Sequence, residues 1–214
     1  MKARGVIFDL WDTLVDWPAS EAEVLNRGLA VRIGLSDAEF AERWQAHYIL
    51  SQTGSLARLY RSLGVPDEHA GGHIAERHAF ARRALSPRAG AVETLDELRR
   101  RGVKVGLITM CSEDVPDVWH ETELAGRFDT ETFSARTGLK KPDAEIYLST
   151  AAGLGVAPEE CLFVGDGAND ELGGAARAGM TPVLMATGNE PQWPEVQEWS
   201  GLRVSSIQEV LELC

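Results

Sequence analysis

The sequence predicts a doubly wound α/β domain with a parallel sheet and a helical segment inserted after its first strand. Three observations support this fold class. From residue 86 onwards, short apolar runs alternate with helical patterns, as in parallel sheets covered by helices. One apolar run, Val6–Phe8, stands alone before a long block of helical patterns. Several apolar runs end in a polar residue, and ligands of open α/β sheets bind at the carboxyl ends of the strands.

The first strand is short and is predicted to be buried. Val6–Phe8 is an apolar run that ends in Asp9, which is typical of a central parallel strand. Helical patterns follow from about residue 20 to residue 84, with no convincing strand among them. Ser20 and Glu23 have the spacing of a capping box at the start of this block.

The inserted block also carries aromatic residues at helical spacing. Phe40, Trp44 and Tyr48 fall near one helical face, and we expect Trp44 and Tyr48 to pack rather than to contact a substrate. We therefore divide the chain into an α/β core of residues 1–16 and 86–214 and a helical cap of residues 17–85.

The elements after the insertion are read in chain order. The pattern predicts helices at 86–102, 112–124, 141–155 and 169–179, strands at 103–110, 161–166 and 181–186, extended segments at 128–135 and 202–206, and a terminal segment at 207–214.

Composition excludes several classes of function. The formal net charge of −12 disfavours nucleic acid and acidic membranes as partners. No apolar run is long enough to span a bilayer, and the N-terminal residues lack the layout of a signal peptide. The three cysteines are an odd number without metal-type spacing, so we expect free thiols and a cytoplasmic protein. The sequence does not indicate an oligomeric state.

Polar residues gather at the predicted strand ends. Asp9 ends the first strand, Thr109 ends the second, Asp166 ends "CLFVG", and Lys141 precedes a helix. Carboxylates brought together repel one another unless a cation neutralises them, which indicates Mg²⁺. An ammonium, a hydroxyl and helix N-terminal N–H groups suit a tetrahedral anion such as phosphate.

With these residues at the strand ends, the chain resembles the haloacid dehalogenase (HAD) superfamily of hydrolases, whose core is Rossmann-like. Four pieces carry the resemblance in the right order: "FDLWDTL", "LIT", "KKPDAEIY" and "VGDGANDELGGAARAG". It covers nearly the whole chain, with the helical insertion matching a small cap after the first motif. The resemblance implies an aspartyl nucleophile that acts on a small, phosphorylated substrate.

The resemblance also implies residue roles. Asp9 would be the nucleophile, Thr109 would bind phosphoryl oxygens, Lys141 would balance charge, and Thr13 would orient the loop. Asp9, Asp166, Asp170 and the backbone carbonyl of Trp11 would hold Mg²⁺, with Glu171 as an alternative to Asp170. Met110 and Trp11 would border the substrate.

One residue departs from the phosphatase pattern of this family. Phosphatases of the family carry an aspartate as general acid and base two residues after the nucleophile, and Trp11 stands there. Indole cannot take that role, and Asp12 stands one residue too far along for us to favour it. We expect a Mg²⁺-dependent phosphatase that prefers good leaving groups such as aryl or acyl phosphates.

Two alternatives stay open. The 2-haloacid dehalogenases of the family resemble this chain in their aromatic residue at that position, but they lack the metal-binding aspartates and carry an arginine where Gln45 follows Trp44. The chain could also bind a phosphorylated ligand without cleaving it. A Schiff-base mechanism like that of phosphonoacetaldehyde hydrolase is disfavoured, because the insertion contains no lysine.

Overall fold

The computed structural model describes residues 3–188 and 194–214, and its core is a six-stranded, all-parallel sheet. The strand order is β3-β2-β1-β4-β5-β6. This order confirms the predicted doubly wound fold, because the direction of strand succession reverses beside β1. The strands are β1 (Gly5–Phe8), β2 (Lys104–Thr109), β3 (Thr130–Phe133), β4 (Cys161–Gly165), β5 (Thr181–Met185) and β6 (Leu202–Val204).

Helices cover both faces of this sheet. They are α6 (Ala91–Arg100), α7 (Asp114–Val118), α8 (Ser134–Thr137), α9 (Ala144–Leu154), α10 (Glu171–Arg177) and α11 (Pro194–Gln197), with 3₁₀ helices η1 (Trp119–Glu121), η2 (Pro158–Glu160), η3 (Ala168–Asp170) and η4 (Ile207–Glu212). Successive strand residues point to opposite faces, so Val6 and Phe8 pack with α6 and α7, whereas Ile7 packs with α9 and α10. Each face of the sheet thus has its own apolar core.

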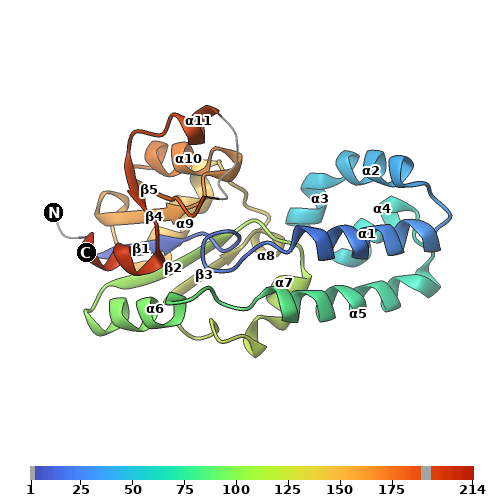
Figure 1. Cartoon of the computed structure of the whole chain (residues 1–214), viewed down its shortest axis with the longest axis horizontal. Coiled ribbons are helices and arrows are strands. Elements are labelled where there is room, and N and C mark those ends of the chain that lie inside the picture. The colour runs from blue at the N-terminus through green and yellow to red at the C-terminus, as the bar shows by residue number, and fades with distance from the viewer. Residues whose placement is uncertain (1–2, 189–193) are drawn as a thin grey trace.

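The residues between β1 and α6 form a separate group of helices at one end of the molecule, opposite both termini (Figure 1). These helices are α1 (Ala19–Arg32), α2 (Asp37–Ala46), α3 (Tyr48–Thr53), α4 (Leu56–Leu63) and α5 (Asp67–Ala84). They enclose an apolar cluster of their own, which includes Leu29, Phe40, Leu59 and Tyr60. We call α1–α5 the helical insertion.

Two details of the insertion differ from the sequence prediction. Helix α1 begins at Ala19 after Pro18 and has no side-chain cap, so the predicted box at Ser20 is wrong. The capping box instead opens α2, where Ser36 and Glu39 bond reciprocally. The chain also breaks at His47, which places Tyr48 in α3 rather than in one helix with Phe40.

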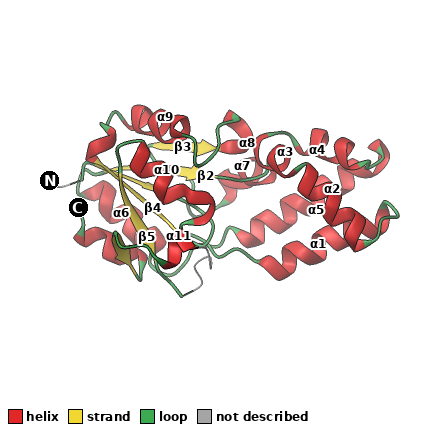
Figure 2. Cartoon of the chain, turned by 90° about the horizontal axis from the view of Figure 1, so that it is seen from above, coloured by secondary structure: helices red, strands yellow, loops and turns green. Residues whose placement is uncertain are grey.

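The helical insertion rests on the carboxyl edge of the sheet, and two of its helices pack directly on helices of the core. Helix α5 packs along α7, and α3 packs against α8, as the view from above also shows (Figure 2). Ser134 Oγ donates to the Gln52 carbonyl across the second contact and accepts from the Cys111 N–H at 2.9 Å. The space between insertion and sheet edge is therefore bounded on both sides.

Two expectations about the whole chain can be compared with the structure. All three cysteines are free thiols, as the sequence predicted, and Cys111 and Cys161 are buried. In the ranges that the structure describes, no helix combines the length and apolar character needed to cross a membrane.

Candidate active site

The ends of the two central strands bring Asp9 and Asp166 together. Strands β1 and β4 pair in parallel with Phe8 opposite Val164, and the Asp9 N–H donates to the Val164 carbonyl at 2.8 Å. Both aspartates are buried, and they follow their strands at the edge where the sheet order reverses. This is the position at which open α/β sheets bind ligands.

Lys141 reaches this edge from the loop before α9. Its Nζ donates to Asp9 Oδ1 at 2.5 Å and also to Glu171 Oε2. Burial alone would lower the pKa of Lys141, but the carboxylates of Asp9 and Glu171 outweigh it and raise the pKa. The ammonium therefore stays charged beside the candidate nucleophile.

Glu171, and not Asp170, joins the buried carboxylates. Asn169 and Asp170 both have left-handed backbone angles, with φ of 55° and 54°, and the turn directs the Asp170 carboxylate to Arg177 Nη2 at 2.8 Å. The Asp170 carboxylate is thus engaged by Arg177, and the sequence expectation that it joins Asp9 and Asp166 is not met in this structure. Glu171 is fully buried and accepts from the Gly167 N–H at 2.9 Å.

Gly165 makes room for that glutamate. A Cβ atom at Gly165 would lie 2.1 Å from Glu171 Oε1, far inside van der Waals contact. The absence of a side chain at the last residue of β4 therefore allows the Glu171 carboxylate to lie behind the strand end.

The carboxylates of Asp9, Asp166 and Glu171 form a compact acidic group. One oxygen from each lies within 4.8 Å of the others. The pKa of Asp166 is raised to about 6, mainly by burial and secondly by the charge of Asp9. Burial also raises the pKa of Glu171 well above its usual value. A bound divalent cation would offset these penalties, and carboxylate oxygens are the ligands that such hard cations prefer. The group fits a metal site.

Thr109 and Thr13 are fully buried near this group. Among the residues that the structure describes, neither hydroxyl oxygen has a hydrogen-bond partner. Neither residue lines the cavity, whereas Met110 lines it and its Sδ accepts from the Lys141 N–H at 3.3 Å. Met110 therefore borders the cavity, and its contact with a substrate stays a prediction.

Trp11 also faces the cavity, and a neighbouring network holds its loop. The Trp11 ring meets the Trp17 ring edge to face, with centroids 4.9 Å apart. Asp12 Oδ1 accepts from the Trp17 N–H at 3.0 Å, and Arg88 donates to the Asp12 carbonyl and to Asp16. Burial raises the pKa of Asp12. Sequence reasoning missed Arg88, which lies far along the chain.

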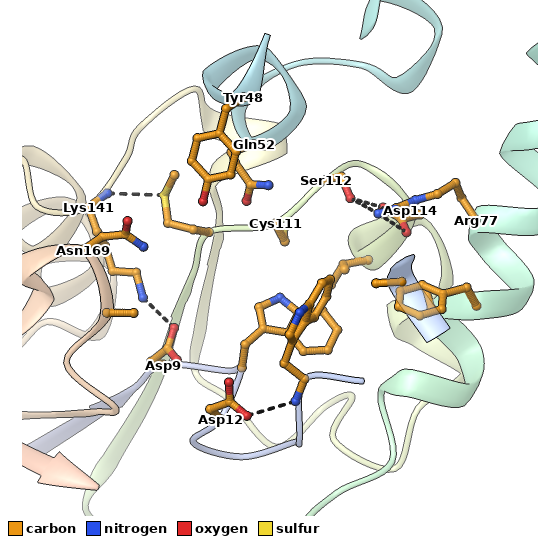
Figure 3. Close-up of a pocket in the computed structure, with 18 of the residues that line it drawn as sticks. Asp9, Asp12, Tyr48, Gln52, Arg77, Cys111, Ser112, Asp114, Lys141 and Asn169 are labelled. Carbon is orange, nitrogen blue, oxygen red and sulfur yellow. Dashed lines mark hydrogen bonds and ion pairs between the residues drawn. The ribbon is translucent and has the colours of Figure 1, made fainter. Parts of the chain in front are cut away.

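A cavity of about 370 Å³ separates the acidic group from the helical insertion. Figure 3 shows Tyr48 and Gln52 of α3 on the side opposite Asp9 and Asp12. Trp44 stacks on Phe40 with centroids 5.8 Å apart, as expected of a packing residue, but it lines the cavity too. Tyr48 lines the cavity as well, so both residues border the space in which a substrate would lie.

A buried ion pair closes another side of the cavity. Arg77 of α5 lies 3.0 Å from Asp114 and donates to Ser112 Oγ at 2.6 Å (Figure 3). All three residues are less than 9% exposed and line the cavity. The sequence offered no signal for this cluster, because Arg77 and Asp114 belong to different layers of the fold.

Comparisons with known proteins identify the family to which the chain belongs. A family model for haloacid dehalogenase-like hydrolases matches residues 3–179, so the chain belongs to this family of hydrolases. A phosphoserine phosphatase from Thermus thermophilus is 34% identical over 153 residues, which span 67% of this chain and 59% of that protein.

Solved structures share the fold over nearly the full length. A HAD phosphatase from Thermococcus onnurineus aligns with a TM-score of 0.73 and 22% identity, covering 100% of this chain and 97% of that one. A 2-haloacid dehalogenase from Pseudomonas syringae pv. tomato aligns with a TM-score of 0.72 and 21% identity, covering 99% and 97%. Both structures are similar to this chain in fold.

Proposed function

We propose that this HAD-family hydrolase is a Mg²⁺-dependent phosphatase that acts on a small phosphorylated compound through Asp9. One observation carries the proposal: the Asp9 carboxylate lies beside the Lys141 ammonium and in one acidic group with Asp166 and Glu171. A nucleophile, a fixed cation and a set of oxygen ligands meet at one point, which suits phosphoryl transfer. The related phosphoserine phosphatase supports a phosphate substrate.

Asp9, Asp166 and Glu171 would hold the metal. In this proposal Glu171 takes the role that the sequence assigned to Asp170, and the Trp11 carbonyl remains a further candidate ligand. A bound Mg²⁺ would supply positive charge that stabilises the oxygens of the transferring group.

The side chains of the site can then be given roles in two steps. An Asp9 oxygen attacks phosphorus, the bond from phosphorus to the leaving oxygen breaks, and the leaving group departs with the electron pair. Water next attacks phosphorus, the bond from phosphorus to Asp9 breaks with its electron pair returning to the carboxylate, and phosphate leaves while the water loses a proton to solvent. Lys141 balances the charge on Asp9 in both steps. The Thr109 hydroxyl has no partner among the described residues, but Thr109 does not line the cavity, so we assign it no contact with the substrate.

Trp11 limits which substrates can react. Without an aspartate at this position, no residue there protonates the leaving oxygen or activates the water, and such a group is worth about 10²–10⁴ in rate. Leaving groups that depart as stable anions, such as those of aryl and acyl phosphates, are therefore favoured. The aspartyl-phosphate on Asp9 should accumulate during turnover, and intact-mass spectrometry of the quenched protein would detect it.

The helical insertion is the proposed cap, spanning residues 17–85. It bounds the cavity on the side away from Asp9, which favours a small molecule over a polymer as substrate. Free thiols are consistent with action in the cytoplasm.

A dehalogenase is the second candidate, because Trp11 places an aromatic residue beside the nucleophile and halide leaves without a proton. The acidic group disfavours it, since displacement of halide from carbon needs no cluster of three carboxylates. A protein that binds phosphate compounds without cleavage is the third candidate.

The deciding experiment is release of p-nitrophenol from p-nitrophenyl phosphate with and without Mg²⁺, using Asp9→Asn as the blank. The leaving group departs unprotonated near neutral pH, so the assay reports on nucleophile and metal alone. Turnover that needs both Asp9 and Mg²⁺ supports the phosphatase. Halide release from 2-haloacids without turnover of the phosphate ester would favour the dehalogenase.

A further inference from the structure

The wall of the cavity beyond the acidic group is aromatic. Trp11 and Trp17 meet edge to face at 4.9 Å, and Trp17 continues to Phe80 at 6.0 Å. Tyr48 and Gln52 lie across the cavity on α3 (Figure 3). A leaving group attached to a phosphoryl group at Asp9 would enter the space between these two sides.

Trp17 is held in place although it is not buried. Its side chain is 40% exposed, which leaves a large apolar ring uncovered at the cavity. Its backbone N–H donates to Asp12 Oδ1 at 3.0 Å, Arg88 in turn donates to the Asp12 carbonyl, and the ring itself contacts the rings of Trp11 and Phe80. A partly uncovered ring that already packs against two other rings is a suitable surface for a flat apolar ligand, because these contacts restrict the side chain before binding.

The charges of the cavity disfavour a second anionic group on the ligand. Among the described residues that line it, the cations are Arg77 and Lys141. Arg77 is neutralised by Asp114 at 3.0 Å, and Lys141 is engaged by Asp9 and Glu171. No cation in this wall is therefore left for a carboxylate or a second phosphate, and a desolvated anion without a partner is costly.

We propose that the cavity takes an uncharged aromatic leaving group, which packs between the Trp11–Trp17 pair and Tyr48, so that aryl phosphates are its substrate class. The inference rests on the proposed phosphatase function and narrows it, because acyl phosphates share the good leaving group but have no ring to pack. Trp17 and Tyr48 are then residues that determine specificity.

The test is binding to the full-length Asp9→Asn variant with Mg²⁺, measured by calorimetry with 1-naphthyl phosphate and with inorganic phosphate. We expect naphthyl phosphate to bind at least tenfold more tightly. Trp17→Ala should weaken the affinity for naphthyl phosphate about tenfold and change the affinity for inorganic phosphate by less than twofold. Val24→Ala, at an exposed position of α1, is the matched control and should change neither.

Equal affinity for the two ligands would overturn the aromatic site, and so would an equal loss of affinity for both in Trp17→Ala. Either result would leave the phosphatase proposal standing, because phosphate still binds. Absence of phosphate binding in both the Asp9→Asn variant and the unsubstituted protein would overturn the phosphatase proposal together with this inference. Tyr48→Leu provides a second variant that keeps bulk and removes the ring. In a chain that keeps Asp9, Trp17→Ala should lower kcat/KM for p-nitrophenyl phosphate. It should leave kcat/KM for acetyl phosphate within twofold of the unsubstituted protein.

Discussion

The Lys141 ammonium bridges two buried carboxylates: Nζ donates to Asp9 Oδ1 at 2.5 Å and also to Glu171. The side chains of Lys141, Asp9 and Glu171 are 4%, 5% and 0% exposed, so water screens these charges little. Buried charges are tolerated when they are paired, and Lys141 is the partner that two carboxylates share.

Replacing this lysine should therefore destabilise the protein. We expect Lys141→Met to lower the free energy of unfolding by about 3–5 kcal/mol in metal-free buffer, because it leaves buried carboxylates unpaired. Urea denaturation followed by circular dichroism would measure it. Lys140→Met is the matched control, since Lys140 lies 3.9 Å from the exposed Asp143 and outside the acidic group. Equal losses in the two variants would contradict the assignment.

Two adjacent acidic residues should differ in their effect on metal binding. Glu171 belongs to the acidic group, whereas Asp170 pairs with Arg177 at the surface. We expect Glu171→Gln to weaken Mg²⁺ binding about 10–100-fold and Asp170→Asn to change it less than about threefold. Calorimetric titration with Mg²⁺ decides between them, and the opposite order would return the ligand role to Asp170.

The strand-end residues of the site could be predicted because parallel register depends on simple patterns. Apolar runs ending in Asp9, Thr109 and Asp166 had to place those residues at one edge once the strands paired. The exchange of Asp170 for Glu171 could not be predicted in the same way. It depends on left-handed backbone at Asn169 and Asp170, a conformation that these residue types tolerate but do not require.

The cavity wall was harder to predict for a different reason. Arg77 and Asp114 are 37 residues apart, and their pairing depends on how α5 packs along α7. Tyr48 was assigned to a packing face because its spacing from Phe40 is helical, but the break at His47 turns it towards the cavity. Contacts between layers follow from tertiary packing, which residue spacing within one helix does not contain.

Restoring an aspartate at Trp11 should change which phosphate esters react. We expect Trp11→Asp to raise the turnover of an alkyl phosphate, relative to p-nitrophenyl phosphate, about 100-fold, because an alkoxide must be protonated to leave. Steady-state phosphate release measures both substrates. Asp12→Asn is the control and should keep turnover within a few-fold, since Asp12 is engaged by the Trp17 N–H. Loss of activity in Asp12→Asn would identify Asp12 as the proton donor.

The ion pair between α5 and α7 should stabilise the contact of the helical insertion with the core. Arg77→Met leaves Asp114 buried without its cation and should lower the free energy of unfolding by about 3 kcal/mol or more. A double-mutant cycle with Asp114→Asn should give a coupling energy above about 1 kcal/mol. The exposed pair of Arg82, also on α5, with Glu121 of η1 should show a smaller coupling energy. Additive losses in the Arg77 and Asp114 variants would contradict the pairing.

Asp129 should contribute stability that depends on pH. Burial opposes its ionisation, but the Val105 N–H at 2.9 Å and the Lys104 ammonium outweigh burial and hold the pKa of Asp129 below its usual value. A depressed folded-state pKa adds stability above the unfolded value of 3.8, and this stability is lost as pH falls through the folded value. Asp129→Asn should therefore cost about 1 kcal/mol at neutral pH, and the cost should shrink below about pH 4. Urea denaturation midpoints of the unsubstituted protein and of Asp129→Asn, taken at about pH 7, 5 and 3.5, measure this difference. Glu42→Gln, on the exposed face of α2, is the control. A cost that stays constant across these pH values would show that the carboxylate charge is not its source.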